Sequence, residues 1–288
     1  MKKVIVLGAN GQLGKTIKDL PDSGTIDFHF YSRSDLDITN KTKLETLFAY
    51  SDFDYCINCA AYTNVEGAET NTEDAFLINA EGARHIAEVC NVYHVKLIHI
   101  STDYVFDGES IEPYTTTDQT NPINQYGKSK LQGELYIQEQ LNEYYIIRTS
   151  WLYALHGKNF VKTIINKIKE DSTLNITTEQ VGTPTSCVDL AHFIIHLINQ
   201  GIVPYGVYNF SANGSTTWYE FAKEIAKNYN SDKLEKIKTS GSFKTVAKRP
   251  KYSVFDLKKT ERIYKELNTW QNSVGDLIKA YKAGKYLK

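Results

Sequence analysis

The chain has 288 residues, of which 41% are hydrophobic and 23% are charged, as in ordinary globular proteins. This composition excludes a disordered chain, a collagen and a small disulfide-rich domain, and the length suggests about two domains or one enlarged α/β unit. The 33 basic and 34 acidic residues leave a formal net charge of −1, so no overall charge attracts nucleic acid or an anionic membrane.

Short apolar runs alternate with helical patterns through the first half of the chain. The expected strands are 3–7, 28–31, 55–59, 96–101 and 144–149, and the expected helices are 12–20, 41–50, 72–93 and 126–140. Thr70 and Glu73 have the spacing of a capping box at the start of the helix at 72–93. Strands separated by helices need crossover connections, so the pattern predicts a doubly wound, Rossmann-like parallel α/β sheet in a domain at residues 1–152.

After Trp151 this alternation loosens. The expected elements are helices at 159–170, 187–200, 217–229 and 269–283 and a strand at 208–211, with Thr217 and Glu220 as a capping box. The mixture predicts a smaller mixed α/β domain at residues 153–288 that binds the substrate, with a segment near 183–200 returning to the first domain. No Gly/Ser-rich linker separates the halves, so we expect them to share an interface.

A glycine-rich loop follows the first expected strand and opens the first helix. It reads Gly8-Ala9-Asn10-Gly11-Gln12-Leu13-Gly14. Glycines there permit a tight turn and a close approach of the backbone to a pyrophosphate, which the N–H groups of the helix hold. The phosphate loop of nucleoside triphosphatases would need glycine where Ala9 stands. We therefore predict a dinucleotide site, against the alternative of an ordinary βα connection.

The end of the second strand bears on which nicotinamide cofactor is used. NAD-binding proteins usually place Asp or Glu there for the ribose 2′-hydroxyl. Here Arg33 can pair with a 2′-phosphate, and Ser32 or Ser34 can add a hydrogen bond. This favours NADP(H), while Asp35 and Asp37 nearby leave NAD(H) open. Asp37 and Ile38 are expected beside the adenine ring.

Two spacings of metal-binding type need an interpretation. Cys56 and Cys59 match C-x-x-C, but they fall in an expected buried strand and no second pair with zinc spacing follows. His192 and His196 are four residues apart on a helix, but no third ligand is evident. We predict structural cysteines, an interface or partly buried histidine pair, and no metal site. His99 in the fourth strand is expected to serve packing.

Tyr126 and Lys130 form a Tyr-x-x-x-Lys pair at the start of an expected helix. Residues four apart share a helix face, where the ammonium favours the phenolate and lowers the tyrosine pKa. Tyr126 can then protonate a carbonyl oxygen as hydride reaches the carbon, and Lys130 can hydrogen-bond the nicotinamide ribose. Thr102, at the end of the preceding strand, can hydrogen-bond the same substrate oxygen. The same spacing recurs in expected outer helices, starting at Tyr219, Tyr229 and Tyr281.

Together these segments resemble the extended short-chain dehydrogenase/reductase family over nearly the whole chain. The most specific segments are Ala60-Ala61-Tyr62-Thr63 and Ser101-Thr102-Asp103-Tyr104-Val105-Phe106. More narrowly, they are similar to segments of its nucleotide-sugar 4-ketoreductases. The resemblance implies NADPH-dependent reduction of the C4 ketone of dTDP-4-dehydro-β-L-rhamnose to dTDP-L-rhamnose.

The resemblance also implies roles for individual residues. It places the glycine loop and Lys130 around the cofactor, together with Gly11, Gln12, Leu13, Asp37, Ile38, Ala60, Ala61, Tyr62 and Thr63. Around the sugar and its diphosphate it places Thr102, Asp103, Tyr104, Tyr126, Trp151, Asn159 and Arg249.

Two departures from the family pattern are visible. Some members dimerise through magnesium held by glutamates, but here Lys15-Thr16 and Val188 stand at the corresponding places. This argues against a magnesium-bridged dimer and leaves a monomer or a different homodimer open. In addition, Lys251-Tyr252-Ser253 lacks the usual asparagine before the serine. Two other functions stay open: a reductase or epimerase of another nucleotide-linked 4-keto sugar, and a catalytically silent regulatory subunit of the same fold.

The sequence gives no sign of export or membrane insertion. No stretch approaches the roughly 18 to 20 consecutive apolar residues of a membrane-spanning helix. The apolar run at the N-terminus stops at Gly8, too soon for the hydrophobic core of a secretory signal. We therefore expect a cytoplasmic protein without a membrane or nucleic-acid partner.

Overall fold

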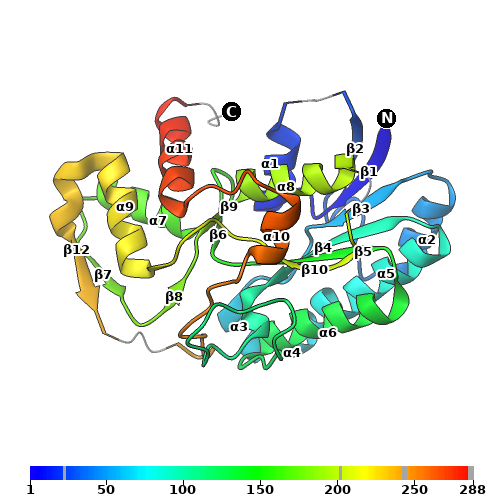
Figure 1. The fold of residues 1–288 in the computed structure, drawn as a ribbon, viewed down its shortest axis with the longest axis horizontal. Helices are drawn as coiled ribbons and strands as arrows, with labels where there is room; N and C mark the ends of the chain where they lie inside the picture. Colours follow the sequence, from blue (N-terminus) through cyan, green and yellow to red (C-terminus); the bar gives the residue numbers. More distant parts are fainter. Residues whose placement is uncertain (22–23, 201–202, 242–244, 285–288) are drawn as a thin grey trace.

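The structure is a computed structural model that describes residues 1–21, 24–200, 203–241 and 245–284. Within these residues, six parallel strands form one sheet in the order β10-β5-β4-β3-β1-β2 (Figure 1). They are β1 (Lys2–Leu7), β2 (Ile26–Tyr31), β3 (Tyr55–Asn58), β4 (Lys96–Thr102), β5 (Tyr144–Thr149) and β10 (Gly206–Asn209). The predicted doubly wound α/β fold is confirmed.

Helices cover both faces of this sheet. On one face lie α1 (Gln12–Asp19) and α8 (Cys187–Gln200), and on the other lie α2 (Lys41–Ala49), α5 (Gly82–Val92) and α6 (Gln125–Gln140). Val4 and Val6 of β1 pack in the first layer, whereas Ile5 and Leu7 pack in the second. Alternate residues of a strand point to opposite faces, so burial on both sides explains the nearly continuous apolar strands.

The helix expected at 72–93 begins and ends almost as predicted but is not uniform. It consists of α4 (Thr72–Phe76), a π-helical turn at Leu77–Glu81, and α5. The predicted capping box is wrong. Thr70 is the last residue of α3 (Val65–Thr70) and donates its hydroxyl to the Gly67 carbonyl at 3.1 Å, while Asn71 precedes α4 without a side-chain cap.

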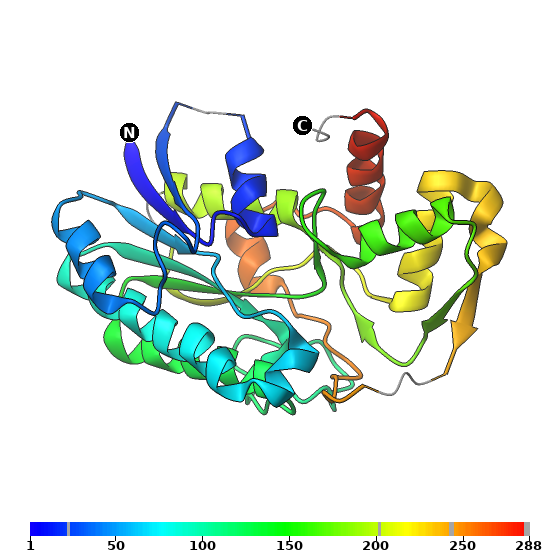
Figure 2. The ribbon, with the colours of Figure 1, turned by 180° about the vertical axis from the view of Figure 1, so that it is seen from behind.

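The second half of the chain builds a smaller unit beside the sheet, and it also supplies α8 and β10 to the sheet layers (Figures 1 and 2). Its helices are α7 (Phe160–Lys169), α9 (Trp218–Asn230) and α11 (Trp270–Lys282), and its outermost strands are β7 (Leu174–Thr177) and β12 (Ile237–Ser240). Ile164, Phe221 and Val274 come from the three helices and share one apolar core. The Thr217 part of the predicted capping box is confirmed, since its hydroxyl accepts the Glu220 N–H at 3.2 Å.

Short elements connect these units. They are the 3-10 turns at Asp103–Val105 and Ser231–Lys236, the strands β6 (Leu152–Tyr153), β8 (Val181–Gly182), β9 (Thr185–Ser186) and β11 (Thr216–Thr217), and α10 (Lys258–Ile263). The strand expected at 208–211 is β10, displaced by two residues and paired with β5. In the part of the chain that the structure describes, no helix is long and apolar enough to cross a membrane.

Candidate active site

The glycine loop between β1 and α1 leaves no room for side chains at two positions. Gly8 has φ +76°, and a Cβ there would lie 2.6 Å from the Ala60 nitrogen. A Cβ at Gly14 would lie 2.7 Å from Ala9 Cα. Gly11 precedes α1 and offers no side chain to the N–H groups of the first helical turn. The loop therefore presents bare backbone and a helix N-terminus, which suits a pyrophosphate.

A cavity of about 200 Å³ lies beside this loop at the carboxyl ends of the strands. It is lined by Gly8, Asn10, Gly11, Arg33, Leu36, Asp37, Ile38, Cys59, Ala60, Ala61 and Ile78. Most of these residues were predicted to bind the cofactor, and the set combines apolar walls with one cation and one anion. Such a lining fits an adenosine group.

Arg33 is the exposed cation of this cavity. Its Nε lies 3.2 Å from the Asp37 carboxylate. Despite the opposing effect of burial, hydrogen bonds from Thr39 and Arg33 lower the pKa of Asp37. Ser32 is buried, and its hydroxyl donates to the Asp35 carboxylate at 2.6 Å, so Ser32 has a partner inside the protein. Arg33 is thus the better placed of the two to reach a ligand phosphate.

A larger cavity of about 770 Å³ collects most of the remaining predicted residues. From the predicted set it is lined by Asn10, Gly11, Gln12, Leu13, Ala61, Thr63, Thr102, Asp103, Tyr104, Tyr126, Lys130, Trp151, Asn159 and Arg249. The Tyr-x-x-x-Lys pair and the glycine loop therefore open on one space. Ser32, Tyr62 and Gly14 line neither of the two cavities, and Tyr62 is held by two backbone hydrogen bonds to the Asn79 side chain.

The start of α6 positions Tyr126 in the larger cavity. Asn124 caps the helix by accepting the Gly127 N–H at 2.7 Å. Only glycine fits at 127, because a Cβ would lie 2.1 Å from the Tyr104 carbonyl oxygen. This close approach stacks the Tyr104 ring edge-on against Tyr126, with centroids 5.6 Å apart. The Thr102–Tyr104 turn and the first turn of α6 are therefore locked together.

The predicted lowering of the Tyr126 pKa is wrong. Desolvation raises the pKa of Tyr126 above its usual value near 10, and a hydrogen bond with Thr102 opposes this only in part. Asp103 and Tyr104 add to the rise, because a phenolate would face negative charge. Tyr126 is therefore a phenol, and a phenol is the form that donates a proton.

Lys130 is directed into the protein. Its Nζ donates to the Ile100 carbonyl at 2.7 Å and lies 3.1 Å from His99 Nε2. The residue is 1% exposed, and burial lowers the Lys130 pKa to about 8. The interpretation of His99 as a packing residue is incomplete, since it contacts the candidate catalytic lysine directly.

Asp103 is a buried carboxyl group in the same cavity. Burial raises the pKa of Asp103 to about 6, although hydrogen bonds from Ser253 and Thr102 favour its ionised form. Thr102 Oγ1 donates to Asp103 Oδ1 at 3.1 Å. The cavity thus holds an acidic group that changes charge near neutral pH.

Arg249 is held by residues from the other half of the chain. Its Nη2 lies 2.8 Å from Glu66 Oε1, and its Nη1 donates to the Tyr104 hydroxyl at 3.1 Å. Glu66 Oε2 also accepts the N–H groups of Val246, at 2.8 Å, and Ala247, at 3.3 Å. Glu66 thereby joins α3 to the segment 245–249, and Arg249 faces the cavity with its charge already paired.

Asn159 connects the smaller unit to the glycine loop. Its Nδ2 donates to Gln12 Oε1 at 2.8 Å and to the Ala154 carbonyl at 2.6 Å, while Oδ1 caps α7 by accepting the Lys162 N–H at 3.1 Å. A predicted substrate residue thus contacts a predicted cofactor residue.

Among the described residues, no group of three or more His, Cys, Asp or Glu side chains is placed to hold a metal ion. All four cysteines are free. Burial raises the pKa of Cys56 and of Cys59, which disfavours reactive thiolates.

Comparison with known proteins places the chain in a family. Residues 1–283 match the family described as RmlD substrate binding domain. The chain belongs to this family. A curated relative, dTDP-4-dehydrorhamnose reductase of Aggregatibacter actinomycetemcomitans, is 34% identical over 98% of this chain and 99% of its own length. The Escherichia coli K12 protein of the same name is 33% identical, over 96% of both chains.

Solved structures agree with this membership. A dTDP-4-dehydrorhamnose reductase from Clostridium acetobutylicum has a TM-score of 0.91 and 38% identity, covering 97% of this chain and 99% of its own. One from Bacillus anthracis in complex with NADP has a TM-score of 0.88 and 37% identity, covering 96% and 99%. The fold prediction and the family resemblance are therefore both confirmed.

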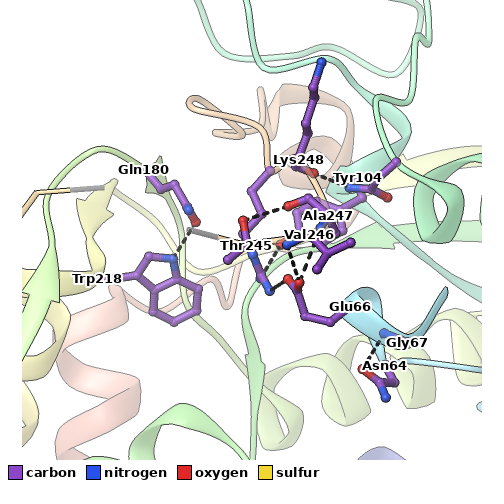
Figure 3. Close-up of polar contacts among 12 residues, drawn as sticks. Asn64, Glu66, Gly67, Tyr104, Gln180, Trp218, Thr245, Val246, Ala247 and Lys248 are labelled. Carbon is purple, nitrogen blue, oxygen red and sulfur yellow. Dashed lines mark hydrogen bonds and ion pairs between the residues drawn. The ribbon is translucent and has the colours of Figure 1, made fainter. Parts of the chain in front are cut away.

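In this RmlD family member Trp218 lines the large cavity, although the sequence did not predict a role for it. Trp218 begins α9, and its indole stacks on that of Trp151 with centroids 3.7 Å apart and planes 9° apart. Trp151 has φ +45°, and a Cβ at Gly182 would lie 2.7 Å from its ring. Trp218 Nε1 donates to Gln180 at 2.9 Å (Figure 3). The two indoles form one aromatic wall of the large cavity. In the sequence, only the predicted cap at the neighbouring Thr217 drew attention to this region.

Proposed function

We propose that the chain reduces the C4 ketone of dTDP-4-dehydro-β-L-rhamnose to give dTDP-L-rhamnose, with NADPH as the electron donor. The observation that carries the proposal is the shared cavity: Tyr126, Lys130 and Thr102 open on the same space as the glycine loop. The names of the relatives point to the same reaction, and they cover nearly the full length of the chain.

The cofactor would occupy the two adjoining cavities. Its adenosine fits the 200 Å³ cavity between Asp37, Ile38 and Ala60, and its pyrophosphate fits the start of α1 at Gly11. Arg33 is proposed to pair with the 2′-phosphate. The Bacillus anthracis relative in complex with NADP supports this choice, with NAD(H) as the weaker alternative. When bound, the reduced nicotinamide supplies a hydride to the C4 carbon.

The protein's own contribution is to hold and move one proton. As negative charge develops on the C4 oxygen, the Tyr126 hydroxyl donates its proton to that oxygen. The raised pKa of Tyr126 keeps this group protonated at neutral pH. Thr102 is proposed to hydrogen-bond the same oxygen, and Lys130 to hydrogen-bond the nicotinamide ribose and favour the phenolate that Tyr126 becomes.

The sugar and nucleotide would lie against the second half of the chain. We propose that Trp151, supported by Trp218, packs against the deoxysugar ring, and that Asp103 and Tyr104 contact its hydroxyl groups. Arg249 is proposed to approach the diphosphate. In this assignment residues 1–152, with 183–200, bind the cofactor, and residues 153–288 bind the substrate.

One experiment tests the assignment. Purified protein is mixed with NADPH and enzymatically prepared dTDP-4-dehydrorhamnose; NADPH absorbance is followed and the product sugar is identified by NMR. Loss of absorbance with dTDP-rhamnose as product is the expected result. Turnover only with UDP- or GDP-linked 4-keto sugars would show a different reductase, and binding without turnover would show a silent subunit.

A further inference from the structure

A chain of three buried side chains leads from the proposed active site into the protein. Asn58 ends β3, His99 lies in β4, and Lys130 lies in α6, each 1% exposed. Asn58 Nδ2 is 3.0 Å from His99 Nδ1, and His99 Nε2 is 3.1 Å from Lys130 Nζ. The imidazole therefore bridges the amide and the lysine, using both of its nitrogens.

The backbone determines how the Asn58 amide is oriented. Asn58 Oδ1 accepts the N–H of Ala60 at 3.0 Å, so the amide oxygen faces Ala60 and the NH₂ group faces His99. An NH₂ group can only donate, so His99 Nδ1 must accept and carries no proton. Burial holds the pKa of His99 well below 6.5, so the ring is neutral. Its one proton is then on Nε2, the nitrogen that faces Lys130.

This proton decides which form of Lys130 fits the site. A charged ammonium has three N–H groups and no lone pair, so at 3.1 Å from a protonated Nε2 two donors would face each other. A neutral amine has one lone pair, which accepts the Nε2–H, and it still donates to the Ile100 carbonyl. Only the neutral amine satisfies every one of these contacts.

We propose that Asn58 and His99 are positioning residues that set the protonation state of Lys130 through the tautomer of the imidazole. This arrangement stabilises the neutral amine relative to the ammonium, so Lys130 loses its charge at a lower pH than an ordinary lysine does. The inference deepens the proposed reductase function, because the charge of Lys130 is what favours the Tyr126 phenolate.

The other titratable groups around Lys130 favour its ammonium form, but less than burial disfavours it. Glu134, one turn further along α6, is completely buried. Its carboxylate forms an ion pair with Arg148 at 2.7 Å and accepts a hydrogen bond from the Ser101 hydroxyl. Burial raises the pKa of Cys59, so it faces Lys130 as a neutral thiol. Burial therefore lowers the Lys130 pKa to about 8, although Glu134 and Cys59 oppose this shift.

The first test is the tautomer itself, read by ¹⁵N NMR on the unaltered full-length protein near neutral pH. The His99 signals are assigned by their loss in His99→Gln. We expect a protonated Nε2 and an unprotonated Nδ1. A proton on Nδ1 would overturn the proposal. This measurement needs no substrate, so its outcome does not depend on whether the protein reduces a dTDP-linked sugar.

The second test reverses the tautomer with Asn58→Asp. The carboxylate still accepts the Ala60 N–H, but it also accepts a proton from Nδ1, which leaves Nε2 as an acceptor for an ammonium. Activity in the unaltered enzyme should fall as pH rises through the Lys130 pKa. In the variant this limb of the kcat/KM profile should move to higher pH by about one unit or more.

Asn79→Asp is the matched control. Asn79 is also 1% exposed and contacts α6 through Ser129, at 2.9 Å, but it has no hydrogen bond to His99. A buried carboxylate there adds charge without reversing the imidazole. A shift confined to Asn58→Asp supports the proposal, whereas equal shifts in both variants would contradict it.

Discussion

Glu66 on α3 and Arg249 near the end of the chain form a 2.8 Å ion pair that joins the two halves of the protein beside the large cavity. Glu66 also accepts two backbone N–H groups from the segment 245–249. Although burial works against it, hydrogen bonds from Arg249 and from that backbone lower the pKa of Glu66. One carboxylate thus holds both the segment and the arginine that faces the cavity.

Replacing this carboxylate should loosen substrate binding more than it slows chemistry. In Glu66→Ala, Arg249 and the two N–H groups lose their acceptor, so the KM for the nucleotide sugar should rise about ten-fold, with a smaller change in kcat. Asp171→Ala, which removes the exposed pairs with Lys233 and Lys236, serves as the control. Steady-state kinetics of the three proteins check this, and an unchanged KM in Glu66→Ala would refute a role for the pair.

Removing the Tyr126 hydroxyl should abolish most turnover and spare cofactor binding. Tyr126→Phe keeps the ring that packs against Tyr104 but has no proton to give, so kcat should fall by ~10²-fold or more. NADPH affinity, measured by fluorescence titration, should stay nearly constant. Tyr219→Phe is the matched control, because Tyr219 and Lys223 have the same spacing in α9 outside the cavity. Full activity in Tyr126→Phe would exclude it as the proton donor.

Removing the support of the aromatic wall should weaken sugar binding. In Trp218→Ala, Trp151 loses its stacking partner at 3.7 Å, and the KM for the nucleotide sugar should rise up to about ten-fold. Trp218→Phe should recover most of the affinity, because a ring is restored. NADPH affinity should change much less than sugar affinity, since Trp218 does not line the smaller cavity that is proposed to hold the adenosine. Equal kinetic constants for all three proteins would remove Trp218 from the site.

The parts of this fold that the sequence predicts well are those determined by neighbouring residues. The apolar runs of β1 and β3, the glycine loop and the α6 start all depend on local periodicity and turn geometry, and all lie within a few residues of the predicted positions. The cap at Thr217 succeeded for the same reason. The cap at Thr70 failed because a second helix, α3, ends there, and two adjacent helices compete for the same polar side chains.

Site properties that depend on distant packing could not be predicted. The helical spacing of Tyr126 and Lys130 does not show how deeply the two side chains are buried. Burial raises the pKa of Tyr126, which is opposite to the expected shift, and Lys130 contacts His99. Trp151, between β5 and β6, and Trp218, at the start of α9, meet only because these segments fold over the same cavity. Periodicity assigns His99 to one face of β4, but it cannot show that Lys130 lies opposite.

Cofactor selectivity should depend on Arg33. In Arg33→Ala the cation next to Asp37 is lost, so the Kd for NADPH should rise by roughly ten-fold or more while that for NADH changes little. Arg33→Lys should fall in between, because it keeps the charge but loses the planar fork of donors. Fluorescence titration with both cofactors measures the change. Equal losses for NADPH and NADH would exclude a 2′-phosphate contact.

The buried carboxyl of Asp103 should make stability depend on pH. Its pKa of about 6 lies above the roughly 3.9 of an unfolded chain, so the folded state binds the proton more tightly. The stability linked to this proton is fully present below about pH 4, declines as pH rises toward 6, and is lost above that. At neutral pH the ionised group therefore costs about 2–3 kcal/mol.

Asp103→Asn removes this cost while keeping the shape of the side chain. The variant should unfold at a higher temperature than the unaltered protein near pH 8, and the difference should shrink or reverse near pH 4, because the unaltered Asp103 is then protonated. Asp74→Asn changes an exposed carboxylate in α4 and serves as the control for net charge. Thermal unfolding of the three proteins at both pH values tests this. If the difference in unfolding temperature between Asp103→Asn and the unaltered protein does not vary with pH, Asp103 has the same pKa in the folded and the unfolded chain.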